Sequence, residues 1–223
     1  MPAPTRTFTA RHVQLARAAL AAIAAIMITF SPDHSAAVGL SVFGGFTGAT
    51  ALVLVLAAIL VHPKGQRWPS ILLAAVTFLI GAVGSFPTLR TDLTFFIAVA
   101  AWAGITGLIE LILGIRARGT EGARDAMTGG GLGVLLAVLR ALVPIDYSLE
   151  YAVEGNPFTL TGIVIGVGLF GGYAAIVAVF LGIAGLAPNA KKTDASTAEH
   201  PASENDIKTD AGADRLADHG GIA

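Results

Sequence analysis

The chain has 223 residues, of which 54% are hydrophobic and only 13% are charged, about half the charged share of an ordinary soluble domain. Its formal net charge of −1 favours no nucleic-acid partner, and the absence of cysteine excludes disulfides, thiolate metal sites and cysteine nucleophiles. Six apolar segments separated by short polar loops fill residues 12–187 and leave almost no room for a soluble domain.

The apolar segments are predicted to be transmembrane helices, since about 20 residues span a hydrocarbon core of about 30 Å. In chain order they cover residues 12–30, 36–61, 70–86, 94–115, 126–144 and 158–186. The first is the weakest, because its uncharged run covers only residues 18–30. A cleaved signal peptide is the alternative for this segment, with Arg6, Arg11 and Arg17 as its basic region and a cleavage site near Ser35.

The basic residues predict the orientation of the chain in the membrane. If the amino terminus is cytoplasmic, the inner segments hold Arg6, Arg11, Arg17, Lys64, Arg67, Arg116, Arg118, Arg124, Lys191 and Lys192. The outer loops then hold only Arg90, with Arg140 near the outer end of the fifth helix. The positive-inside rule therefore predicts that both termini, including residues 1–11, lie in the cytoplasm.

Residues 188–223 differ in composition from the rest of the chain. They are rich in Ala, Asp, Glu, Ser, Thr and Lys and have almost no large apolar residue. Such a stretch cannot bury enough surface to offset its chain entropy, so the sequence predicts a disordered cytoplasmic tail. A docking site for a partner, with a transient helix over residues 206–216, is the alternative for this tail.

A two-helix hairpin is predicted to occur three times, over about residues 12–61, 70–115 and 126–186. Each odd-numbered helix is followed by a proline at the outer face, Pro32, Pro87 and Pro144, at near-equal spacing. Proline is expected just beyond a helix end because it cannot continue the hydrogen-bond ladder. The even-numbered helices also align when Phe43, Trp102 and Phe170 are placed together. Such duplication occurs in transporters and in structural bundles alike.

Parts of the first two predicted hairpins resemble a known family of membrane proteins. Residues 101–118, AWAGITGLIELILGIRAR, resemble the second helix of the HdeD-like short-repeat membrane proteins, and residues 80–87, IGAVGSFP, resemble the end of that family's first helix with its closing proline. Residues 11–46 resemble the same hairpin in a more divergent form. The resemblance implies a six-helix bacterial inner-membrane protein associated with acid stress, and it supplies no catalytic residues. The tail and the loop 145–157 depart from the family pattern.

Glu110 is the most informative single residue, because it lies about 9 Å inside the cytoplasmic edge of an apolar helix at 1.5 Å per residue. A charged side chain costs about 2.5–3.5 kcal/mol at the centre of a membrane helix, so a partner is expected. Arg17 lies at similar depth in the first helix, and the sequence predicts a Glu110–Arg17 ion pair. A packing clamp, snorkelling of both side chains and a proton- or cation-handling role are the open interpretations.

An external protonatable patch is predicted in the loop before the sixth helix. If residues 145–154 are helical, Asp146, Glu150 and Glu154 share one face, with Tyr147 and Tyr151 at the headgroup level. Mutual repulsion would then raise the proton affinity of these carboxylates, and Arg140 would partly neutralise them. A solvated acidic loop is the simpler interpretation.

Glycines at small-xxx-small spacing predict close helix contacts or a homo-oligomer through glycine-rich faces. The pairs are Gly44 and Gly48, Gly129 and Gly133, Gly162 and Gly166, and Gly168 and Gly172. The run of residues 129–133 is no phosphate loop, because neither Lys-Ser nor Lys-Thr follows it. The histidines are isolated, so neither a metal site nor any cofactor is expected.

Together these patterns predict an all-α polytopic membrane protein without enzymatic activity, of the HdeD-like type, acting in acid or envelope stress tolerance. A small transporter or channel subunit is the first alternative, and it requires a polar path across the bundle. In the middle hairpin the sequence offers only Glu110, Thr106, Thr77 and Ser85 for such a path. A membrane scaffold that acts through its tail is the second alternative.

Overall fold

The computed structural model describes residues 8–187 except residues 121 and 154. It contains six helices that are long and apolar enough to cross a membrane, as expected for a multi-pass membrane protein. They are α1 (Ala10–Thr29), α2 (Ala36–Leu60), α3 (Trp68–Ala82), α4 (Asp92–Arg116), α5 (Ala123–Leu142) and α6 (Gly162–Leu186). The predicted fold class is confirmed, whereas the predicted tail lies outside the described residues.

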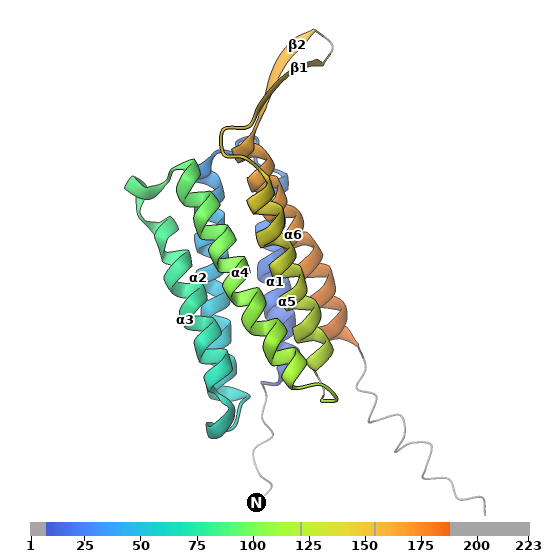
Figure 1. The fold of residues 1–223 in the computed structure, drawn as a ribbon. Coiled ribbons are helices and arrows are strands. Elements are labelled where there is room, and N and C mark those ends of the chain that lie inside the picture. The colour runs from blue at the N-terminus through green and yellow to red at the C-terminus, as the bar shows by residue number, and fades with distance from the viewer. Residues whose placement is uncertain (1–7, 121, 154, 188–223) are drawn as a thin grey trace, which may run out of the picture. The chain divides into compact units, whose positions relative to one another are not determined.

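The helices run alternately up and down between two ends (Figure 1). The start of α1 and the end of α6 lie at one end, which we call the terminal end. The opposite end carries a β-hairpin that consists of β1 (Ser148–Val153) and β2 (Asn156–Thr161), and we call it the hairpin end. Short 3-10 helices occupy the loops on either side of α3: η1 (Lys64–Gln66), η2 (Val83–Ser85) and η3 (Pro87–Leu89).

The loop between α5 and α6 corrects one prediction. The external patch was predicted on the condition that residues 145–154 are helical, but Ser148–Val153 pairs antiparallel with Asn156–Thr161. Polar and apolar residues alternate over residues 148–151 and 158–161, which is the period of a sheet, and Gly155 turns the chain with a φ of 84°. The predicted sixth helix therefore begins at Gly162, and residues 158–161 belong to β2.

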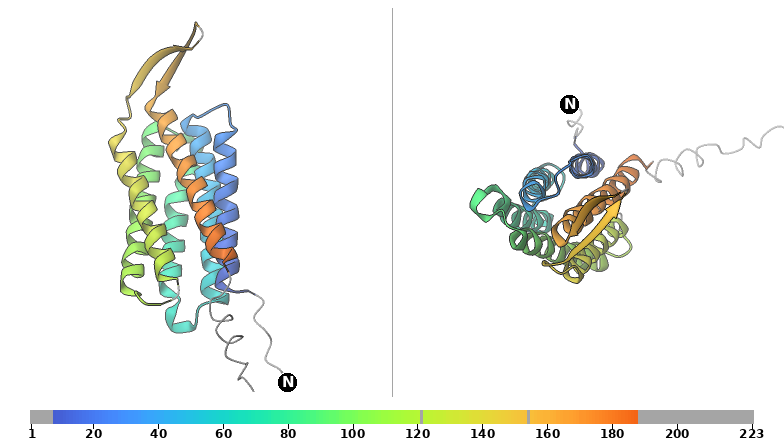
Figure 2. Two further views of the ribbon diagram at one scale, coloured as in Figure 1. Left: turned by 90° about the vertical axis from the view of Figure 1, so that its right-hand side faces the viewer. Right: turned by 90° about the horizontal axis from the view of Figure 1, so that it is seen from above.

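Six consecutive helices form a closed ring, because α1 packs against both α2 and α6 (Figure 2). The most extensive contacts are α2 with α3, α4 with α5 and α6 with α1. Each therefore joins two neighbouring predicted hairpins rather than the two helices of one hairpin. The even-numbered helices α2, α4 and α6 also contact one another inside the ring, so they form its core.

The centre of the core is a cluster of aromatic rings. Phe43 on α2 meets Trp102 on α4 and Phe170 on α6, with ring centres 5.5 and 5.6 Å apart and edge-to-face geometry. Phe46 adds two further contacts of the same kind, to Trp102 and to Phe170. These three aligned positions are the ones that the sequence placed together. Their meeting is what three equivalent hairpins would produce, and the repeat itself stays a prediction.

The outer surface of the bundle is apolar, as lipid contact requires. Large side chains that are more than half exposed include Ile23 on α1, Leu52 on α2, Phe78 on α3, Leu108 on α4 and Ile176 on α6. Small residues instead mark the helix–helix contacts, because backbones can approach closely only where no side chain intervenes. One close approach is between α4 and α5, where Gly107 faces Gly130 and Gly133.

Replacing Gly107 by valine is expected to separate α4 from α5 and to lower the free energy of unfolding by about 1–3 kcal/mol. A Cβ atom at Gly107 would lie 2.7 Å from the backbone nitrogen of Val134 and 2.8 Å from the carbonyl oxygen of Gly130. Gly131 on α5, the other helix of this interface, is the matched control, since a Cβ there has no neighbour within 4 Å. Unfolding in mixed detergent micelles measures both variants, and equal losses would contradict this account.

Candidate functional site: a polar cavity that opens at the terminal end

The predicted ion pair is present. Arg17 Nη2 donates to Glu110 Oε1 at 2.9 Å and joins α1 to α4. The side chains keep exposed fractions of 28% for Arg17 and 16% for Glu110, so the pair is neither sealed in the core nor open to bulk solvent. Arg17 lies one turn beyond Gln14 on α1, and Glu110 lies just under two turns before the end of α4 at Arg116. Both side chains therefore sit at similar depth, as the sequence predicted.

A second polar contact lies one turn nearer the terminal end. Gln14 Nε2 donates to Asp125 Oδ2 at 2.7 Å and joins α1 to α5. Asp125 lies in the first turn of α5, where the free backbone N–H groups and the helix dipole stabilise a carboxylate. Gln14 and Arg17 are three residues apart, so both face the same side of α1. Two cross-links thus tie α1 to its partners on one face.

These two contacts line a cavity of about 240 Å³. All six helices contribute to its walls, which reach His62 in the α2–α3 loop and Gly122 before α5, both at the terminal end. Its polar lining residues are Gln14, Arg17, His62, Ser70, Glu110, Asp125 and Tyr173. The sequence had indicated few polar groups for a path across the bundle, and the structure adds Gln14, Asp125 and Tyr173 to them.

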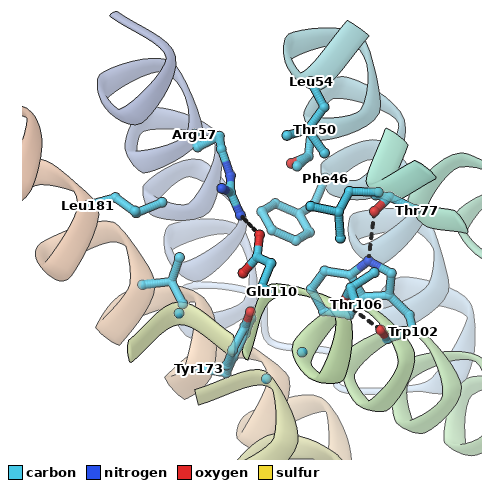
Figure 3. A pocket seen from close by; sticks show the side chains of 15 residues that line it. Arg17, Phe46, Thr50, Leu54, Thr77, Trp102, Thr106, Glu110, Tyr173 and Leu181 are labelled. Atoms are coloured by element: carbon cyan, nitrogen blue, oxygen red, sulfur yellow. Dashed lines mark hydrogen bonds and ion pairs between the residues drawn. The ribbon is translucent and has the colours of Figure 1, made fainter. Parts of the chain in front are cut away.

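The cavity continues past the ion pair into a smaller chamber of about 30 Å³, shown in Figure 3. That volume holds about two water molecules. Thr50 is 5% exposed, and its hydroxyl has no hydrogen-bond partner among the described residues. Thr106 donates to the carbonyl of Trp102 at 2.6 Å, and Thr77 accepts from Trp102 Nε1 at 3.4 Å. Tyr173 points toward Glu110 from α6 (Figure 3).

Aromatic rings close the deep end of this chamber. Phe46 and Trp102 line it, and both belong to the central cluster with Phe43 and Phe170. Tyr173 also contacts Trp102, with ring centres 5.9 Å apart. Ser85, which the sequence placed on a polar path, is exposed near the hairpin end and does not line the chamber. The cavity that reaches Glu110 thus opens at the terminal end, where His62 and Gly122 line it.

The arrangement can handle charge. Glu110 is an acid within a membrane helix with one cationic partner, and the cavity gives water a route to it. An acid, a cation and a polar cavity thus meet at one place, which is the arrangement on which a proton-linked role would rest.

The predicted external patch has a different geometry from the expected one. Glu150 is exposed on β1 opposite Thr159, Asp146 is exposed in the turn after Pro144, and Glu154 lies outside the described residues. Because Ser148–Val153 is a strand, Asp146 and Glu150 do not lie one turn apart on a helix face. The repulsion argument required that helix face, so it does not apply to the described part of the loop.

Arg140 does not neutralise that loop either. It is 2% exposed in the last turn of α5, and its side chain forms no ion pair within the described part of the chain. In the same described ranges, no group of three or more His, Asp or Glu residues is placed to bind a metal ion. Of the predicted glycine pairs, Gly133 and Gly166 meet other helices, whereas Gly48, Gly168 and Gly172 have open space beside them.

The fold and the cavity define the class: a six-helix, multi-pass membrane protein with a polar cavity that enters the bundle from the terminal end. No protein-family model, no curated protein and no solved structure matches the chain. The resemblance to the HdeD-like proteins therefore stays a prediction from the sequence.

Cysteine labelling tests the water access of the cavity without background, because the chain has no cysteine. A cysteine in place of Ser70, on the cavity wall, is expected to react rapidly with a small membrane-impermeant thiol reagent. A cysteine in place of Phe78, whose side chain is 57% exposed on the outer surface of the same helix, is expected to stay unlabelled in a bilayer. Similar rates at both positions would show that the cavity does not fill with water.

Proposed function

We propose that this chain is a non-enzymatic inner-membrane protein of the HdeD-like type that supports acid or envelope stress tolerance, with Glu110 as its proton-accepting group. The single observation that carries the proposal is the Glu110–Arg17 pair at the inner end of a cavity that opens at the terminal end. The concentration of Lys and Arg near the termini and in the loops of that end supports a cytoplasmic opening. Glu110 would then exchange protons with the cytoplasm.

Cytoplasmic pH after an external acid shift is the measurement that tests this proposal. A strain that lacks the protein is expected to acidify faster than the same strain carrying the wild-type chain. Glu110→Gln, which keeps the shape of the side chain but cannot ionise, is expected not to restore the wild-type rate. Glu150→Gln is the matched control, because it removes an exposed carboxylate on β1 outside the cavity. If Glu110→Gln restores the wild-type rate, or if the deletion changes nothing, the proposal fails.

A small solute carrier is the second candidate. The volume of the cavity favours it, since about 240 Å³ lined by charges of both signs exceeds what a proton alone requires. The aromatic cluster at the deep end of the chamber would act as the closed gate of a carrier that takes up its solute from the terminal end. Purified protein in liposomes with an imposed pH gradient separates the two candidates. Proton flux without added solute supports the first, and flux that appears only with a particular solute supports the second.

A further inference from the structure

Arg140 is a second charged group inside the bundle, distant along the helices from the cavity. It lies in the last turn of α5 near the hairpin end, and only 2% of its surface is exposed. None of its three side-chain nitrogens has a hydrogen-bond partner among the described residues. A buried guanidinium without acceptors is costly in a membrane protein, because it has lost the water that would solvate it. Its position therefore needs a chemical explanation.

The residues around the Arg140 guanidinium explain part of how it is accommodated. The guanidinium carbon lies 3.5 Å from the ring centre of Phe96 and 5.5 Å from that of Phe95, both on α4. Gly166 on α6 leaves the space that the guanidinium occupies, since a Cβ there would lie 2.7 Å from the guanidinium carbon. Aromatic rings stabilise a cation through its flat face. The N–H groups, however, point outward in the plane of the guanidinium and still require acceptors.

The start of α6 is the neighbouring element, and it is electropositive. Gly166 lies just over one turn after the first residue of α6, Gly162. The other two inner helices begin with a capping side chain: Ser35 accepts from Val38 N on α2, and Thr91 accepts from Thr94 N on α4. On α6 the corresponding Thr161 makes no capping hydrogen bond, and the first turn holds no acidic residue. The N–H of Gly162 donates to the carbonyl oxygen of Tyr147 at 2.8 Å, but no described side chain caps the N–H groups that follow it. These N–H groups and the dipole of α6 favour a negative charge.

The carbonyl groups at the end of α5 do not serve as acceptors for the Arg140 guanidinium. A cation is favoured near the carboxyl end of a helix, and Arg140 lies in such a turn. Its nitrogens nevertheless donate to no carbonyl of α5 or of any other described residue. The guanidinium of Arg140 and the start of α6, which no described side chain caps, are independent features that lie close together. An anion would complement both of them.

We propose that Arg140 and the start of α6 form a binding site for a small monovalent inorganic anion of the size of chloride. The burial of the guanidinium among Phe95, Phe96 and Gly166 excludes a large organic anion. The site lies on the opposite side of the aromatic cluster from Glu110, and it does not depend on the proposed proton-linked role.

Thermal unfolding of the full chain in lipid nanodiscs tests the site, with chloride as the probe. Sodium gluconate replaces sodium chloride at constant ionic strength, so that only the anion changes. The melting temperature of the wild type is expected to rise with chloride and to saturate, since a ligand that binds only the folded state stabilises it. Arg140→Gln is expected to abolish this dependence. Arg90→Gln is the matched control, because Arg90 is only partly buried at the same end and donates to the carbonyl of Gly84.

Gly166→Ala provides a variant that retains the charge. Its methyl group would displace the guanidinium and raise the chloride concentration for half the effect at least about tenfold, as expected for loss of one charge-assisted contact. The proposal is overturned if the wild type melts at the same temperature in chloride and in gluconate. It is equally overturned if Arg140→Gln retains the wild-type chloride dependence, or if Gly166→Ala leaves the half-effect concentration unchanged.

Discussion

Replacing Glu110 by alanine is expected to lower the free energy of unfolding by about 2–3 kcal/mol, because the change leaves Arg17 in the membrane without a counter-charge. This loss is smaller than the loss of about 3–5 kcal/mol for a fully buried pair, since both side chains are partly exposed in the cavity. Unfolding in mixed detergent micelles measures the effect.

The double variant Arg17→Met/Glu110→Met is the control that isolates the pair. It replaces both charges by apolar side chains of similar length, so no unpaired charge remains. Its stability is expected to lie within about 1 kcal/mol of the wild type, well above that of Glu110→Ala. If the double variant is as unstable as Glu110→Ala, then the packing around the pair, rather than the pair itself, holds α1 against α4.

This contrast also separates structure from function. A pair that acts only as a clamp can be replaced by two methionines without loss of acid tolerance. A proton-accepting Glu110 cannot, because methionine does not ionise. A stable double variant that fails to restore the cytoplasmic pH would therefore assign the role of Glu110 to its proton rather than to its packing.

Charges inside apolar segments were the most predictable part of the site. Glu110 and Arg17 are rare ionisable residues within their helices, and their depth follows from counting residues to the helix ends. The contact between Gln14 and Asp125 was not predicted, because the predicted fifth helix begins at residue 126 and leaves Asp125 outside it, where a carboxylate needs no partner. Its signal was the three-residue spacing from Gln14 to Arg17, which places both on one face.

The remaining features depend on tertiary geometry. The alignment of Phe43, Trp102 and Phe170 could be read from the sequence, but not that their rings meet in one cluster. The burial of Arg140 depends on which face of α5 turns inward. The sequence does not indicate that face, because glycines occur on several faces of the helix. The β-hairpin could have been predicted, because polar and apolar residues alternate with the period of a strand in residues 148–151 and 158–161.

Replacing Trp102 by alanine is expected to have the largest effect on stability, a loss of about 3–5 kcal/mol. The side chain is 4% exposed and contacts Phe43, Phe46 and Tyr173. Its removal also takes the N–H donor from Thr77. Lipid cannot fill the resulting void from outside the ring, so the lost contacts are not replaced. Trp68→Ala is the matched control: that side chain is 57% exposed, and its loss is expected to cost under about 1 kcal/mol.

The same substitution tests whether the aromatic cluster closes the cavity. Trp102 lines the deep chamber on one side and meets the core cluster on the other, so alanine would extend the chamber toward the hairpin end. Liposomes carrying Trp102→Ala are then expected to dissipate an imposed pH gradient faster than wild-type liposomes. Trp102→Phe, which keeps a ring at this position, is expected to remain tight. A gradient that decays equally with all three proteins would show that the barrier to protons lies elsewhere, nearer Arg140 and the hairpin end.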